Sequence, residues 1–126
     1  MRVRSVPPTA KSIHFVYAEW CPHCVTTTME QMRKAAAELG VSFQAHNVDT
    51  SDVQVADELV KKYGDWSPDY LVPQVFMEFE DGSFKHVLTG DPRGVAYTNR
   101  AVEEFLSSRF YLDLKTSKVG KGGKTD

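Results

Sequence analysis

Two cysteines stand close together where the chain changes from strand to helix periodicity. The run Ile13-His14-Phe15-Val16-Tyr17 is short, apolar and rich in β-branched and aromatic residues, which predicts a buried strand. After Pro22 the apolar residues recur at steps of three and four, as on one face of a helix: Val25, Met29, Met32, Ala36 and Leu39. Gly40 follows where a helix C-cap belongs. We therefore expect Cys21 and Cys24 at a strand-to-helix turn.

The rest of the chain continues this alternation. Residues 41–48 predict a second strand, and Ser51-Asp52-Val53-Gln54 has the form of a capping box that opens a second helix. The segment 75–88, with Asp81-Gly82 in its middle, predicts a β-hairpin. Residues 99–110 predict a last helix that buries Val102, Phe105, Leu106 and Phe110. The order β-α-β-α-β-β-α predicts an α/β fold: a mixed four-stranded sheet flanked by about three helices.

Length and composition predict one domain. The chain has 126 residues, and we expect an N-terminal extension at 1–11, a folded domain at 12–112 and a disordered tail at 113–126. The net charge of -2 predicts neither a nucleic-acid nor a membrane partner. No apolar run has the length of a membrane span or of a signal peptide, so we expect a cytoplasmic protein. We also expect it to be a monomer.

A reactive role explains the cysteine pair better than a structural disulfide does. A disulfide between Cys21 and Cys24 would close a very short loop and would therefore add little stability. A thiolate at Cys21 would face unpaired N–H groups at the positive end of the helix, and both favour the anion. Pro22 suits the first helical turn, where its missing N–H is not needed. Cys24, almost one turn later, is the candidate resolving thiol. His23 would stabilise the thiolate and make the disulfide a stronger oxidant, although it could also be a solvated helix residue.

Two other interpretations of the cysteine pair are less consistent with the sequence. It could be half of a zinc site, with further ligands drawn from His14, His23, His46 and His86, but the sequence holds no second paired ligand set. We therefore expect no metal. The cysteines could instead be inert core residues, but Pro22 and His23 interrupt any apolar face there.

Two segments resemble the thioredoxin superfamily. The run Phe15-Val16-Tyr17-Ala18-Glu19-Trp20-Cys21-Pro22-His23-Cys24 resembles its active-site segment, and the Pro-His spacer matches the A-type disulfide oxidases. The run Leu71-Val72-Pro73-Gln74-Val75-Phe76 resembles the strand-opening proline segment and is especially similar to glutaredoxins. The resemblance covers about residues 12–110 and implies a thioredoxin-like fold.

The resemblance also implies an activity and roles for single residues. It implies exchange of protein or peptide disulfides, with Cys21 as nucleophile, Cys24 as resolving thiol and no cofactor beyond the redox-active Cys21–Cys24 disulfide. Glutathione or a thioredoxin-reductase-type donor would supply electrons. Pro73 should be cis, Val72 should offer backbone hydrogen bonds to a docked substrate strand, and Trp20 should shield the sulfurs. Gly90 falls where thioredoxins have a groove-lining glycine, but it could also be an ordinary turn glycine.

Three features depart from the family pattern. Phe15 stands where thioredoxins carry a buried Asp, so the proton acceptor for Cys24 could be Glu19, His46 or water. Glutaredoxins hold glutathione with a Gly-Gly and an acidic pair, whereas this chain has Asp91 and Arg93, which could bind a small charged ligand or form a turn. The long connection 65–71 carries Trp66 and Tyr70, which could contact a partner or fold back over the core. A glutathione-dependent reductase and a non-catalytic binding module remain alternatives.

Overall fold

The computed structural model describes residues 9–21, 27–68 and 70–116. The predicted active-site residues Pro22, His23 and Cys24 lie outside these ranges.

A mixed four-stranded sheet forms the centre of the molecule. Its strands are β1 (Ala10–Tyr17), β2 (Ser42–Asn47), β3 (Gln74–Phe79) and β4 (Phe84–Thr89). Their order across the sheet is β2-β1-β3-β4. Strands β1 and β2 are parallel, whereas β3 is antiparallel to both β1 and β4. The predicted α/β class, the mixed sheet and the hairpin are thus confirmed.

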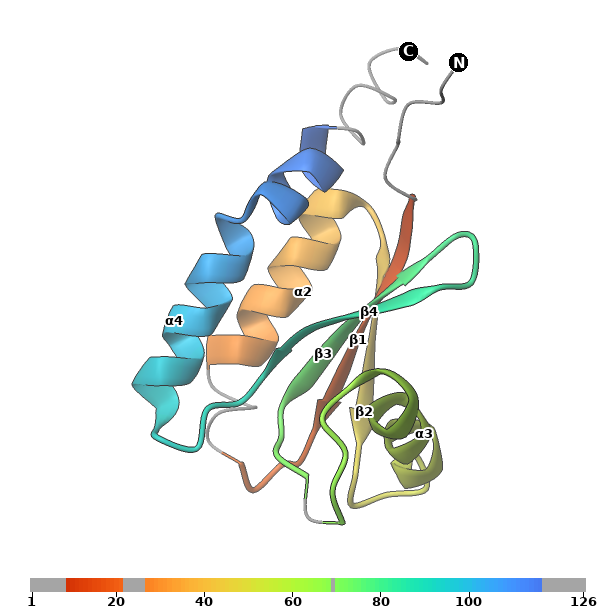
Figure 1. Cartoon of the computed structure of the whole chain (residues 1–126), viewed down its shortest axis with the longest axis vertical. Helices are drawn as coiled ribbons and strands as arrows, with labels where there is room; N and C mark the ends of the chain where they lie inside the picture. The colour runs from red at the N-terminus through yellow and green to blue at the C-terminus, as the bar shows by residue number, and fades with distance from the viewer. Residues whose placement is uncertain (1–8, 22–26, 69, 117–126) are drawn as a thin grey trace.

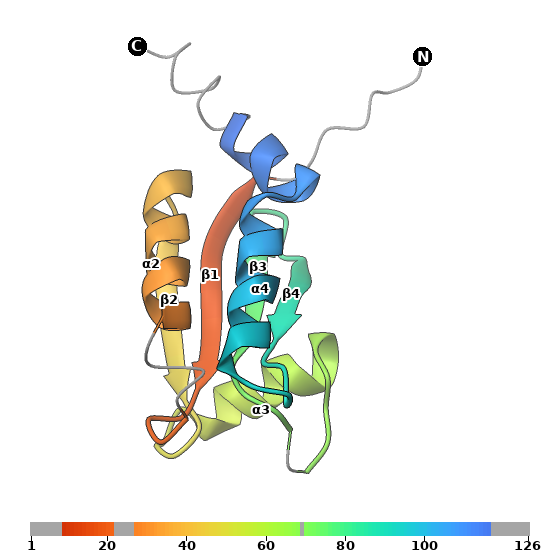
Figure 2. The same cartoon turned by 90° about the vertical axis from the view of Figure 1, so that its left-hand side faces the viewer.

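Helices cover both faces of the sheet. They are α2 (Thr27–Leu39), α3 (Val53–Tyr63) and α4 (Val95–Leu106), which follow the strands in the predicted order. Helices α2 and α4 pack side by side on one face, and α3 lies on the other (Figures 1 and 2). The sheet therefore separates two layers of side chains.

The alternation of side chains along β1 divides the core between these layers. Phe15 packs in the larger cluster under α2 and α4, together with Met32, Met77 and Val102. Val16 points to the opposite face and packs in a smaller cluster with Ala56, Leu59, Val60 and Phe76 under α3. Burial on both faces explains why β1 reads as a continuous apolar run.

The start of α3 differs from the predicted capping box. Its N-cap is Asp52, which makes no side-chain cap hydrogen bond and has α-helical angles (φ -72°, ψ -5°). A capping side chain needs an extended backbone at this position. The Asp52 N–H donates instead to Thr50 Oγ1 at 3.2 Å, so a turn in front of the helix replaces the capping box.

The last helical region begins earlier and extends further than predicted. Helix α4 starts at Val95 and ends at Leu106, and the chain is helical again over 109–116. Ser107 Oγ donates to the Glu103 carbonyl at 2.7 Å and Ser108 Oγ accepts from the Tyr111 N–H at 3.2 Å, so these hydroxyls end one helix and open the next.

The folded part continues past the predicted boundary at residue 112. Tyr111 and Leu114 are buried in the larger core cluster, and the Tyr111 hydroxyl donates to Glu38 of α2 at 2.6 Å. At the other end, β1 already begins at Ala10, inside the predicted extension 1–11. The described fold thus reaches a few residues beyond the predicted boundaries at both ends, because single apolar residues there pack against the core.

Candidate functional site

Cys21 follows β1 after one tight turn. Its N–H donates to the Ala18 carbonyl at 3.2 Å, and only 3% of the residue is exposed. The residue belongs to the larger core cluster. The predicted start of the helix at Pro22 lies outside the described ranges, and the described part of α2 begins at Thr27.

The register of the sheet brings the two predicted motifs together. Val16 of β1 pairs with Gln74 of the antiparallel β3, so β1 ends where β3 begins. Cys21 and Val72 extend from these two ends, and the Cys21 Sγ–H donates to the Val72 carbonyl at 3.6 Å. The Val72–Pro73 peptide bond is cis, as the resemblance implies.

Gly90 joins the same cluster from the end of β4, because Thr89 pairs with Gln74. The Gly90 N–H donates to the Pro73 carbonyl at 2.7 Å. A Cβ atom at Gly90 would lie 2.7 Å from the Val72 carbonyl oxygen and 2.8 Å from Pro73 Cδ, closer than real Cβ atoms approach other atoms. A side chain would therefore push Gly90 away from the Val72–Pro73 segment, and glycine permits this close approach.

Trp20 borders an open groove beside this cluster. Its side chain is 70% exposed, and it lines a groove of about 260 Å³ together with Val48, Val53, Asp57, Pro68, Tyr70 and Val72. Val72 belongs both to the groove and to the contact with Cys21. The groove is therefore adjacent to the sulfur.

The loop 65–71 contributes one wall of this groove. Tyr70 donates its hydroxyl to Asp57 Oδ1 at 2.7 Å, and burial together with this bond raises the pKa of Tyr70. The rings of Trp66 and Tyr70 are 5.4 Å apart, and the Lys61 ammonium lies 4.7 Å from the centre of the Trp66 ring. Tyr70 thus lies over α3 and lines the groove, while Trp66 remains 42% exposed.

Gln74 fixes both ends of this loop, a role that sequence reasoning missed. Its side chain is fully buried and accepts the Asp65 N–H at 3.0 Å. Its amide N–H groups donate to the carbonyls of Asp65 at 3.2 Å and Leu71 at 3.0 Å. The sequence contains a signal for this role, because the amide side chain of Gln74 stands within the apolar run Val-Pro-Gln-Val-Phe. An amide that is buried there requires several hydrogen-bond partners.

Two histidines and a glutamate form a hydrogen-bonded chain across β2, β1 and β3, on the face of the sheet to which Val16 points. His14 Nε2–H donates to Glu78 Oε1 at 2.8 Å, and His14 Nδ1 lies 2.9 Å from His46 Nε2. Burial lowers the pKa of His46, and the neighbouring His14 lowers it further, while Asp52 opposes the shift. The hydrogen bond from His14 holds the pKa of Glu78 below its usual range.

Cys24 lies outside the described ranges, so only the surroundings of its two candidate side-chain proton acceptors are described. His46 is bonded to His14, and Glu19 is exposed. Within the described ranges, Val72 is the one hydrogen-bond partner of the Cys21 sulfur. Asp91 and Arg93 pair with each other in the turn before α4, with Arg93 Nη2 2.7 Å from Asp91 Oδ2, which favours the turn interpretation.

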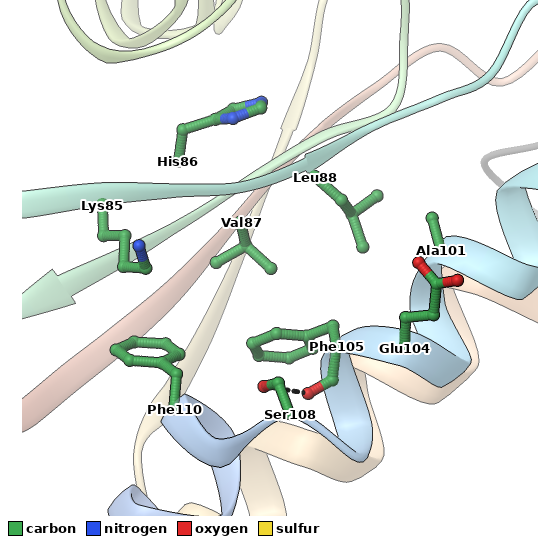
Figure 3. Close-up of a pocket in the computed structure, with 9 residues that line it drawn as sticks. All are labelled: Lys85, His86, Val87, Leu88, Ala101, Glu104, Phe105, Ser108 and Phe110. Carbon is green, nitrogen blue, oxygen red and sulfur yellow. Dashed lines mark hydrogen bonds between the residues drawn. The ribbon is translucent and has the colours of Figure 1, made fainter.

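A larger cavity of about 390 Å³ lies between β4 and α4 (Figure 3). Val87, Leu88 and Phe105 point into it, and the Lys85 ammonium lies 5.1 Å from the centre of the Phe110 ring. None of the described residues predicted for the thiol site, namely Trp20, Cys21, Val72, Pro73 and Gly90, lines this cavity. Among the described residues, no group of three or more His, Cys, Asp or Glu side chains is arranged to hold a metal ion.

Comparison of the chain with models of protein families, with curated proteins and with solved structures finds no match. No helix in the described part of the chain has both the length and the apolar character that a bilayer span requires.

Proposed function

We propose that this chain exchanges protein or peptide disulfides through the Cys21–Cys24 pair, as a thiol–disulfide oxidoreductase of the thioredoxin superfamily. The contact of 3.6 Å between Cys21 Sγ and the Val72 carbonyl carries the proposal. It supports exchange because the sulfur then lies beside a backbone segment that could hold a substrate strand. The adjacent groove lined by Trp20 offers space for the substrate's side chains.

The reaction would proceed in two thiolate attacks. The Cys21 thiolate attacks one sulfur of a substrate disulfide, forms a bond to it and releases the other substrate sulfur as a thiolate. The Cys24 thiolate then attacks Cys21, closes the Cys21–Cys24 disulfide and releases the first substrate sulfur. The substrate gains the two electrons that the dithiol loses. The reverse steps oxidise a substrate dithiol.

The Val72 carbonyl would have two roles in this sequence. In the thiol form it accepts the Cys21 S–H, which is a weak donor. When Cys21 loses its proton, this hydrogen bond is lost and the carbonyl is free to accept an N–H of the substrate backbone. Gly90 allows the segment to keep its position, because it bonds to the Pro73 carbonyl and adds no side chain.

Insulin reduction tests the proposal. We expect turnover with the wild-type protein and loss of turnover in Cys21→Ser, with circular dichroism as the control for folding. Equal, negligible activity in wild type and Cys21→Ser would instead indicate a binding module. Activity on glutathione mixed disulfides that survives Cys24→Ser would indicate a glutathione-dependent reductase.

The reduction potential tests the role of His23. Because an added donor or positive charge stabilises the thiolate, we expect a potential less reducing than the roughly -270 mV of thioredoxin. Equilibration of the dithiol with glutathione measures it. A value at or below that of thioredoxin would contradict this role of His23.

A further inference from the structure

The groove beside Cys21 combines apolar walls with one charge. Trp20, Val48 and Val53 supply apolar surface, and Tyr70 and Val72 continue it from the other chain segment. Among the described residues that line the groove, Asp57 is the one charged side chain. A long side chain with an apolar stem and a polar end matches this combination.

The carboxylate of Asp57 is held in place but is not neutralised by a described residue. The Tyr70 hydroxyl donates to its Oδ1 at 2.7 Å. No ion pair joins Asp57 to a lysine or arginine within the described ranges, and Lys61, one turn along α3, lies over the Trp66 ring. The second carboxylate oxygen is therefore available to a cationic group from outside.

Several residues that directly precede or follow the groove-lining residues in the chain are also acidic. Three lining residues each have an exposed acidic neighbour in the chain: Glu19 beside Trp20, Asp49 beside Val48, and Asp52 beside Val53. No lysine or arginine is a direct chain neighbour of any lining residue. This arrangement attracts cations and disfavours acidic side chains.

We propose that the groove binds a lysine or arginine side chain of the substrate peptide, close to its reactive cysteine, with Asp57 as the charged contact. The stem of that side chain lies along Trp20 and Val53, and its cationic end reaches Asp57. This specificity rests on the proposed exchange at Cys21. The two sites are linked because Val72 both lines the groove and accepts the hydrogen bond of the Cys21 sulfur. The substrate class is therefore basic cysteine-containing peptides.

Two peptides that differ at one position next to the cysteine test the specificity. One carries Arg and the other Glu, and each has thionitrobenzoate linked to its cysteine, so that exchange releases a coloured thiolate. We expect the reduced protein to react about fivefold faster with the Arg peptide at low salt, the size of effect that a partly exposed ion pair gives. Asp57→Asn should reduce this ratio to about one, while its amide oxygen can still accept the Tyr70 hydroxyl.

Glu58→Gln is the matched control, because it removes the same charge from an exposed neighbour on α3 that does not line this groove. It should keep the Arg preference. Equal rates for the two peptides, or a preference that survives Asp57→Asn or disappears equally in Glu58→Gln, would overturn the proposal.

A second pair of peptides, with Ser in place of Cys, separates this inference from the proposed function. Their binding is followed by the shift of the Trp20 indole resonance. Preferential binding of the Arg peptide without exchange on either cysteine peptide would support the groove assignment and refute the exchange activity. Exchange on both cysteine peptides without any preference would support the activity and refute the basic specificity.

Discussion

Cys21 and His14 are both buried polar groups on or beside β1, yet their surroundings differ. Each ring nitrogen of His14 lies within hydrogen-bond distance of another side chain, and both His14 and His46 are buried. Within the described ranges, the Cys21 sulfur has one weak contact, with the Val72 carbonyl, and Val72 in turn lines an open groove. His14 thus has a partner at both ring nitrogens, whereas the Cys21 sulfur has a single weak partner among the described residues.

From this difference we infer that the histidine chain serves stability, whereas the surroundings of Cys21 serve the proposed disulfide exchange. A buried polar chain whose members satisfy one another contributes to stability and is costly to interrupt. A sulfur with a weak partner beside a groove can change partners at little cost. We therefore expect substitutions at the histidines to change stability and its pH dependence, and substitutions around Val72 and Gly90 to change disulfide exchange.

Removal of His14 should have the largest effect on stability. His14→Ala removes the described hydrogen-bond partner of the buried His46 and the shortest contact of Glu78, and we expect it to lower the free energy of unfolding by about 2–4 kcal/mol. Urea denaturation measures this loss. Lys11→Ala is the control, because Lys11 is an exposed partner of Glu78 at 3.6 Å and should contribute less than about 1 kcal/mol. An exchange rate that fell in the folded His14 variant would contradict the separation of the two regions.

Gly90→Ala should affect exchange more than stability. The added Cβ collides with the Val72 carbonyl and Pro73, so we expect a loss of about 1–3 kcal/mol and at least a tenfold slower reaction of Cys21. Stopped-flow kinetics with a small disulfide measures the rate.

Gly82→Ala provides the matched control for Gly90. Gly82 has a φ of 89°, with no atom near the position of an added Cβ, so alanine is strained there by about 1 kcal/mol without touching the site. Its exchange rate should equal that of the wild type. If both variants slowed exchange equally, backbone strain rather than the contact with Val72 would explain the result.

The histidine chain should also give the fold an acid-sensitive stability. The folded-state pKa of His46 lies below its unfolded value of 6.5, so the unfolded chain binds the proton first as the pH falls. The free energy of unfolding should then decrease as the pH drops through 6.5. His46→Gln should flatten this slope in denaturation curves measured between pH 7.5 and 5.5, although the half-buried His86, whose pKa is also lowered by burial, retains part of it.

Glu78 acts in a separate window. Its folded-state pKa is lowered from 4.5, so its contribution to stability is present above that pH and is lost as the pH falls further. A slope around pH 6.5 that did not change in His46→Gln would show that this histidine is not the titrating group.

The smallest predicted effect concerns the wall of the groove. Tyr70→Phe removes the hydrogen bond to Asp57, and we expect a loss of about 1 kcal/mol by urea denaturation. Tyr63→Phe is the control, since no hydrogen bond of the Tyr63 hydroxyl is found among the described residues. Equal losses in both variants would mean that the Tyr70 hydroxyl does not contribute through Asp57.

The order of the elements could be predicted because it depends on local patterns. The β-branched run at 13–17, the three- and four-residue spacing up to Leu39 and the Asp81-Gly82 turn each specify a conformation over a few residues. The break at Ser107 and Ser108 and the turn before α3 could not be predicted. They depend on which of several nearby hydroxyls hydrogen-bonds to the backbone, and the periodicity of the apolar residues does not determine this.

The site was predictable in part for a different reason. The resemblance named Cys21, Val72, Pro73 and Gly90, and the register of β1, β3 and β4 explains why they lie together. The bond from Tyr70 to Asp57 and the loop contacts of Gln74 were not foreseen, because they join residues whose proximity is set only by the packed fold.

The most direct test of the central claim is to trap the mixed disulfide. Cys24→Ser, incubated with a peptide disulfide, should accumulate a covalent adduct with one peptide chain on Cys21, identified by mass spectrometry after proteolysis. Cys21→Ser, which retains Cys24, should form little adduct under the same conditions. Equal adduct formation by the two variants, or none with Cys24→Ser, would contradict the assignment of Cys21 as the nucleophile.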